Sequence, residues 1–122
     1  MYKKIFIILI NFTLLILLSA CSSTIATDIN DNVDMILFYG DGCPHCAKVE
    51  EYIKEHKITE KLNFSQLEVY NDKDNAQLLG EKAQLCNMPT DSIGVPFFWD
   101  GAKCIIGDQE IIKFFKQKLD EK

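Results

Sequence analysis

The Cys-x-x-Cys stretch at residues 43–46 constrains this chain more than any other sequence feature. It follows an apolar run at residues 35–39 and precedes a helix-like segment that extends to about residue 56. A helix N-terminus presents unpaired N–H groups and the positive end of the peptide dipoles. A cysteine placed there is favoured as its thiolate. A pair of cysteines between a strand and a helix therefore predicts redox chemistry more than metal binding.

Each residue of the stretch fits this interpretation. Cys43 would lie at the start of the helix or just before it, and Pro44 suits the first helical position, where no N–H is needed. His45 can add positive charge beside Cys43, which favours the thiolate further. Cys46 follows about one turn later, close enough to close a disulfide ring with Cys43. These four residues are the candidate catalytic set.

Two other interpretations of the stretch stay open, a structural disulfide and half of a zinc site. Zinc would need two further ligands at suitable spacing, usually a second pair of Cys or His residues. The remaining candidates, His56, Cys86 and Cys104, form no such pair. We therefore expect no metal and no other cofactor at this site.

The tetrapeptide Cys43-Pro44-His45-Cys46 matches the active-site motif of the DsbA-type periplasmic disulfide oxidases. Its place between a strand and a helix resembles the thioredoxin superfamily. The resemblance implies that Cys43 is the exposed nucleophile that forms a mixed disulfide with a substrate. It also implies that Cys46, which is more buried, resolves that bond. The motif alone leans towards an oxidase or isomerase.

Residues 34–122 are expected to form the folded domain. Strands are predicted at residues 34–39, 62–70, 95–99 and 103–106, and helices at residues 44–56, 73–86 and 109–119. Asp100-Gly101 predicts a hairpin turn between the last two strands. The first two strands are joined through a helix and should be parallel. This order resembles the glutaredoxin type of the thioredoxin-like α/β fold, a four-stranded mixed sheet flanked by three helices.

Gly94-Val95-Pro96 resembles the cis-proline loop that faces the cysteine pair in the superfamily. The resemblance implies a cis bond before Pro96, a substrate-binding role for the backbone of Val95, and a loop that keeps metal away from the thiols. A trans proline at the first residue of a strand is the alternative.

Two positions and one short segment depart from the family pattern. Gly42 stands where thioredoxins usually have Trp, and Leu37 stands where many members bury a carboxylate that aids proton transfer. Residues 106–108 keep only part of the pattern with which glutaredoxins bind glutathione. The resemblance therefore does not extend to a complete glutathione-binding pattern.

Cys86 and Cys104 form a possible second pair, at the end of the second predicted helix and on the last predicted strand. Disulfides persist in exported proteins, so a structural bond between them is our preferred interpretation. The alternatives are two buried free thiols that pack as small apolar groups and a second redox relay.

Residues 1–20 have the features of a secretory signal. Lys3 and Lys4 precede an almost wholly apolar run at residues 5–18. Leu18-Ser19-Ala20-Cys21 resembles a bacterial lipoprotein box, which implies cleavage before Cys21 and its lipidation. Residues 21–33 would then be the lipidated cysteine and a flexible tether. An ordinary signal peptide or an uncleaved anchor, with Cys21 incidental, is the alternative. Ser22 rather than Asp follows Cys21, which favours the outer membrane in a diderm bacterium.

These patterns favour a membrane-anchored, extracytoplasmic thiol–disulfide oxidoreductase. It would exchange disulfides with exported proteins through Cys43 and Cys46, act as a monomer, and be recycled by a redox partner that sets the direction of electron flow. The net charge of −5 and the absence of Arg give no basic patch for nucleic acid. The alternative is a non-catalytic binding module, such as a copper chaperone that uses the thiols and His45.

Overall fold

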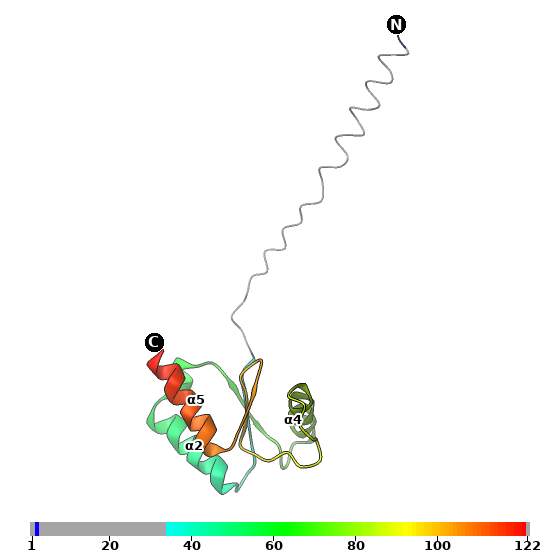
Figure 1. Ribbon diagram of the computed structural model, residues 1–122. Helices are drawn as coiled ribbons and strands as arrows, with labels where there is room; N and C mark the ends of the chain where they lie inside the picture. The colour runs from blue at the N-terminus through cyan, green and yellow to red at the C-terminus, as the bar shows by residue number, and fades with distance from the viewer. Residues whose placement is uncertain (1, 3–33, 122) are drawn as a thin grey trace. The chain divides into compact units, whose positions relative to one another are not determined.

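The computed structural model describes Tyr2 and residues 34–121 (Figure 1). Apart from Tyr2, the predicted signal segment at residues 1–20 lies outside the described residues, and so do Cys21 and the predicted tether up to residue 33. Within the part of the chain that the structure describes, no helix is both long enough and apolar enough to cross a membrane.

Four strands form one mixed sheet in the order β2-β1-β3-β4. The elements are β1 (Ile36–Tyr39), α2 (Pro44–Glu55), α3 (Ile58–Lys61), β2 (Ser65–Glu68), α4 (Lys73–Leu85), β3 (Phe97–Trp99), β4 (Cys104–Ile106) and α5 (Asp108–Asp120). β1 pairs with β2 in parallel and with β3 antiparallel, and β3 pairs antiparallel with β4. The predicted thioredoxin-like α/β fold is confirmed.

The sheet is covered on both faces, with α2 and α5 on one side and α4 on the other (Figure 1). Side chains alternate along β1, so Leu37 faces α2 and α5 while Ile36 and Phe38 face α4. The first face is completed by Val49, Ile53, Ile58, Phe98, Ile111 and Phe115, and the second by Leu79, Ala83, Phe97 and Trp99. Because β1 is buried on both faces, the loop that follows it starts from a rigid support.

The structure differs from the predicted elements between α2 and β2. A short fourth helix, α3, begins after Lys57, whose φ of 51° turns the chain, and it buries Ile58 fully. The predicted strand at residues 62–70 is shorter, because Leu62 and Phe64 pack beside the core under α2 and α5 before the ladder begins. The apolar residues Leu62 and Phe64 therefore belong to the connection between α3 and β2, which packs against the core, and not to the strand itself.

The predicted hairpin turn joins β3 and β4. Asp100 Oδ1 accepts hydrogen bonds from the backbone N–H groups of Ala102 at 2.9 Å and Lys103 at 2.6 Å. Gly101 takes a φ of 98°, which favours glycine. β3 itself begins at Phe97, after Pro96, which has no N–H to contribute to a ladder.

Candidate active site

Cys43 and Cys46 are joined by a disulfide at the start of α2, with their Cα atoms 5.2 Å apart. Cys43 is the N-cap of the helix, and its Sγ accepts a hydrogen bond from the backbone N–H of Cys46 at 3.2 Å. Pro44 occupies the first turn. Cys43 is partly exposed, whereas Cys46 is buried with 6% of its surface accessible. An incoming thiol therefore reaches the sulfur of Cys43 first.

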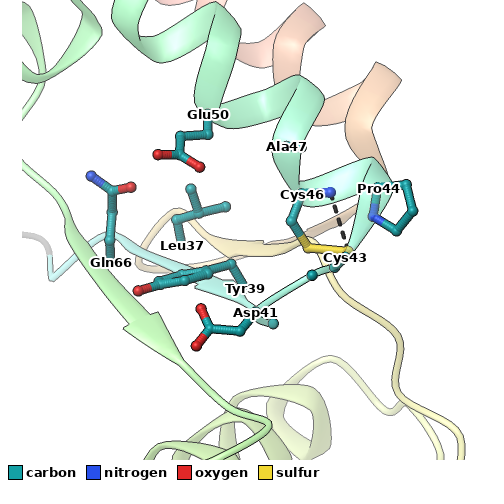
Figure 2. Close-up of a pocket in the computed structure, with 11 residues that line it drawn as sticks. Leu37, Tyr39, Asp41, Cys43, Pro44, Cys46, Ala47, Glu50 and Gln66 are labelled. Atoms are coloured by element: carbon teal, nitrogen blue, oxygen red, sulfur yellow. Dashed lines mark hydrogen bonds between the residues drawn. A yellow bond between two sulfur atoms is a disulfide. The ribbon is translucent and has the colours of Figure 1, made fainter.

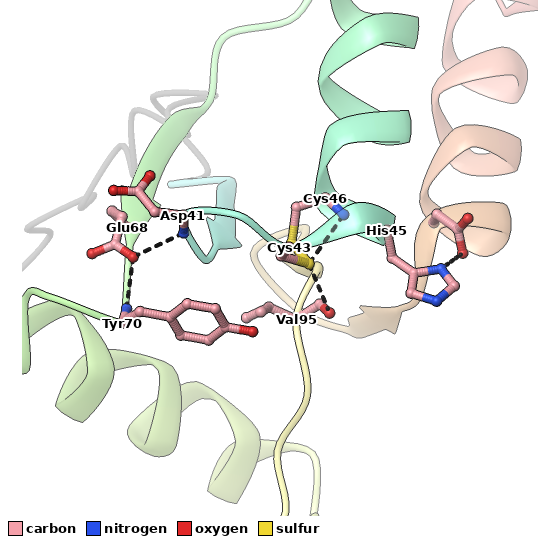
Figure 3. The surroundings of a disulfide bond; sticks show 8 residues. Asp41, Cys43, His45, Cys46, Glu68, Tyr70 and Val95 are labelled. Carbon is pink, nitrogen blue, oxygen red and sulfur yellow. Dashed lines mark hydrogen bonds and ion pairs between the residues drawn. A yellow bond between two sulfur atoms is a disulfide. The ribbon is translucent and has the colours of Figure 1, made fainter.

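Hydrogen bonds to the carboxylate of Glu68 hold the loop that precedes Cys43. Glu68, at the end of β2, accepts hydrogen bonds at Oε1 from the N–H groups of Asp41 at 3.2 Å and Tyr70 at 2.8 Å (Figure 3). Its Oε2 accepts from the N–H of Asn71 at 2.8 Å. Burial would raise the pKa of Glu68, but these hydrogen bonds outweigh it and hold the pKa below the usual range. Sequence reasoning did not predict a role for Glu68.

Close packing also fixes this loop. The Tyr70 ring lies directly against Gly40, where an added Cβ would overlap the ring atoms. Gly42, the position where thioredoxins usually have Trp, takes a φ of +74°, which a residue with a Cβ adopts only with strain. The path of the chain into Cys43 therefore requires glycine at position 42, whereas a larger residue at position 40 would displace the exposed Tyr70 ring.

Replacing Glu68 with glutamine tests this carboxylate support. Because the folded pKa of Glu68 is lowered, its contribution to stability is present above the usual carboxyl pKa and is lost as the pH falls through the folded value. We expect Glu68→Gln to be less stable than the wild type at about pH 7 and to show a smaller loss of stability down to about pH 3. Urea unfolding followed by fluorescence of the buried Trp99 measures both.

The control is Glu51→Gln, which removes an exposed carboxylate from α2. It should leave the pH dependence of stability as in the wild type. If the free energy of unfolding changed with pH equally in Glu68→Gln and Glu51→Gln, the proposed support of the loop by the Glu68 carboxylate would be contradicted.

His45 lies next to the disulfide in sequence, but its side chain contacts α5. Its Nδ1 is 3.2 Å from Asp108 Oδ1, and the imidazole points away from the sulfur of Cys43 (Figure 3). Lys48 Nζ is 3.2 Å from the other oxygen, Asp108 Oδ2. Burial would raise the pKa of Asp108, but the hydrogen bonds from His45 and Lys48 and their charges hold it below the usual range. The structure thus pairs His45 with a carboxylate that the sequence interpretation named only as part of an incomplete glutathione pattern.

The loop before β3 faces the disulfide. The bond between Val95 and Pro96 is cis, and the carbonyl oxygen of Val95 lies 3.7 Å from Cys43 Sγ. Pro96 is buried, and its carbonyl oxygen accepts a hydrogen bond from the N–H of Gly107 at 3.0 Å. This bond connects the loop to the start of α5. The structure therefore brings together the predicted residues of the motif and of the proline loop.

A pocket of about 310 Å³ opens beside the disulfide, on the side of β1 and β2 (Figure 2). Leu37 lies in its wall, and polar side chains reach it from Tyr39, Glu50 and Gln66. The Glu50 carboxylate also pairs with Lys54 at 2.7 Å. Where the family comparison suggested a buried carboxylate, this chain has an apolar side chain next to an open, partly polar pocket.

The second pair, Cys86 and Cys104, is also disulfide-bonded, with Cα atoms 6.2 Å apart. The bond joins the C-cap of α4 to the first residue of β4. Both cysteines pack beside the core between α4 and the sheet. The segment from residue 87 to Pro96, which carries the proline loop, thus begins at a covalent attachment to the sheet.

In residues 34–121, no group of three or more His, Cys, Asp and Glu residues is arranged to hold a metal ion. His56, one candidate ligand in the sequence, lies against the Tyr52 ring with 4.1 Å between ring centroids.

No protein-family model matches the chain, and no curated protein sequence matches it either. Among solved structures, the chain is similar to a wheat glutaredoxin, with 20% identity and a TM-score of 0.47. The match covers 68% of this chain and 69% of that one. This likeness is too distant to carry an activity across. The fold and the cysteine pair at a helix N-terminus indicate thiol–disulfide redox chemistry.

Proposed function

We propose that the chain is an enzyme that exchanges disulfides with exported proteins through Cys43 and Cys46. The observation that carries this is the pair itself: a partly exposed sulfur at the N-cap of α2, bonded to a buried one. The Val95 carbonyl lies beside the exposed sulfur, where the backbone of an extended substrate would pass. A redox partner would be needed to restore the starting state after each turnover.

In the oxidising direction, a substrate thiolate attacks Cys43 Sγ and the bond to Cys46 breaks, so that Cys46 leaves as a thiolate and takes up a proton. A second substrate thiolate then attacks the substrate sulfur of the mixed disulfide. Cys43 leaves as a thiolate, stabilised by the N–H of Cys46 and the helix N-terminus. The substrate loses two electrons and the cysteine pair gains them. The reducing direction runs the same steps backwards.

Reduction of insulin disulfides with dithiothreitol as the electron source tests this activity. The chain should accelerate precipitation of the reduced insulin chains well beyond dithiothreitol alone. A rate equal to that of dithiothreitol alone would count against the proposed function.

We further propose that the protein is exported and anchored by lipid on Cys21. The support is the sequence of residues 1–21, a charged start, an apolar run and a lipoprotein box. Two or more acyl chains would make the anchoring stable. Residues 22–33 would give the domain limited reach from the membrane surface.

Cys21→Ala tests the anchor. We expect loss of lipid labelling and release of the mature domain from the membrane fraction, because Cys21 supplies the sulfur and the new amino terminus that carry the lipid. Metabolic labelling with a fatty acid and membrane fractionation measure the two effects. A Cys21→Ala protein that still carried label would exclude this attachment site.

A further inference from the structure

We propose that Asp108 is a positioning residue that makes the Cys43–Cys46 couple less oxidising, by holding the side chains of His45 and Lys48 away from the reactive sulfur. This inference rests on the proposed thiol–disulfide exchange and addresses how strongly the pair attracts electrons.

Asp108 contacts the side chains of His45 and Lys48 at the same time. Its two carboxylate oxygens are used separately, Oδ1 by His45 and Oδ2 by Lys48, each at 3.2 Å. The side chains of His45 and Lys48 are 64% and 60% exposed, whereas that of Asp108 is only 13% exposed. The carboxylate is therefore the fixed partner, and the two flexible side chains turn towards it.

The position of Asp108 is fixed by the same elements that build the active site. It is the first residue of α5, and Gly107 before it donates its N–H to the carbonyl of Pro96 at 3.0 Å. α5 packs against α2 through the shared core of Val49, Ile111 and Phe115. The carboxylate is thus held beside the first turns of α2, and its lowered pKa keeps it ionised at neutral pH.

A charge near Cys43 changes the reduced form far more than the oxidised form. The reduced pair carries a thiolate, whereas the disulfide is neutral, so a nearby cation stabilises the reduced form and makes the couple more oxidising. Pairing Lys48, and protonated His45, with Asp108 offsets that stabilisation. The imidazole of His45, which points away from the sulfur in Figure 3, then contributes less than the motif alone implies.

Asp108→Asn in the full chain should release the side chains of His45 and Lys48 and favour the reduced form of the Cys43–Cys46 pair. The measurement is the equilibrium constant of the pair in glutathione redox buffers, read by alkylation and mass spectrometry of the peptide that contains Cys43. We expect the constant for formation of the disulfide to fall about tenfold, which for this two-electron couple raises the potential by about 30 mV.

The matched control is Glu110→Gln. It removes one negative charge from the same turn of α5, but Glu110 pairs with Lys113 at 3.7 Å rather than with the motif. This control should change the constant by less than about twofold, because an exposed charge that contacts none of the motif residues is screened. Asp108→Glu should restore most of the wild-type value. Equal constants for Asp108→Asn and Glu110→Gln would overturn the inference.

A variant that lacks His45 and Lys48 distinguishes the proposed pairing with Asp108 from direct repulsion between the Asp108 carboxylate and the Cys43 thiolate. In His45→Gln/Lys48→Gln protein, Asp108→Asn should shift the constant no more than Glu110→Gln does. A full shift in that background would show that Asp108 acts on the sulfur directly and would also overturn the proposal. Insulin reduction by these variants tests the exchange activity separately from the role of Asp108. Continued insulin reduction with an unchanged equilibrium constant in Asp108→Asn would reject the role of Asp108 alone. Absence of exchange by the wild type would reject the proposed function with it.

Discussion

Cys46→Ser is expected to accumulate as a mixed disulfide between Cys43 and its substrates. Without the buried sulfur one turn away, nothing within the pair can attack the bond that Cys43 forms. Cys43→Ser should instead lower exchange by a factor on the order of 10³ or more, as loss of a nucleophile does in other enzymes. Non-reducing gels and mass spectrometry of the trapped species, together with insulin reduction rates, measure the two effects.

The control for both variants is Cys86→Ser/Cys104→Ser, which removes the other disulfide and leaves the motif intact. At a temperature where this protein stays folded, it should keep its exchange activity. Trapped species joined through Cys86 or Cys104 would contradict the assignment of the chemistry to Cys43 and Cys46. Full activity in Cys43→Ser would contradict it too.

Removing the Cys86–Cys104 bond should have the largest effect on stability. The cysteines are 18 residues apart in sequence, and opening a loop of this length lowers the free energy of unfolding by about 3 kcal/mol in the chain-entropy model. For a domain of this size, the midpoint of thermal unfolding should fall by about 10–20 °C. Circular dichroism of Cys86→Ala/Cys104→Ala without reductant provides the measurement.

The effect on stability can be compared with that of removing the Cys43–Cys46 disulfide. Cys43 and Cys46 are only 3 residues apart, so opening that loop costs about 2 kcal/mol by the same relation. Cys43→Ala/Cys46→Ala should therefore unfold at a higher temperature than Cys86→Ala/Cys104→Ala. The reverse order would mean that the Cys86–Cys104 bond does not act as the structural constraint described here.

The core of the fold was predictable because its signals are local. The apolar run of β1, the cysteine pair with Pro44 at the start of a helix, and the Asp-Gly turn each fix a short segment by its own residues. Their order along the chain then leaves few topologies for a mixed sheet. The second disulfide was the preferred interpretation of Cys86 and Cys104, with two free thiols as an alternative.

The parts that sequence reasoning missed depend on packing between distant segments. Glu68 and Asp41 are 27 residues apart and meet only because β2 pairs in parallel with β1. Asp108 reaches His45 only because α5 lies against α2. An acidic residue at the start of a helix is common, because it suits the helix dipole. The sequence interpretation named Asp108 only as part of an incomplete glutathione pattern, and that pattern does not indicate a contact with His45.

The central claim is that the N-terminus of α2 makes the Cys43 sulfur a reactive thiolate. The most direct test is the rate of alkylation of Cys43 in the reduced protein as a function of pH, with mass spectrometry to separate Cys43 from the other thiols. The geometry predicts that the rate reaches half its maximum well below the value of about 8.5 that free cysteine shows. A half-maximum at or above that value would contradict the proposed role of the helix and of the pair.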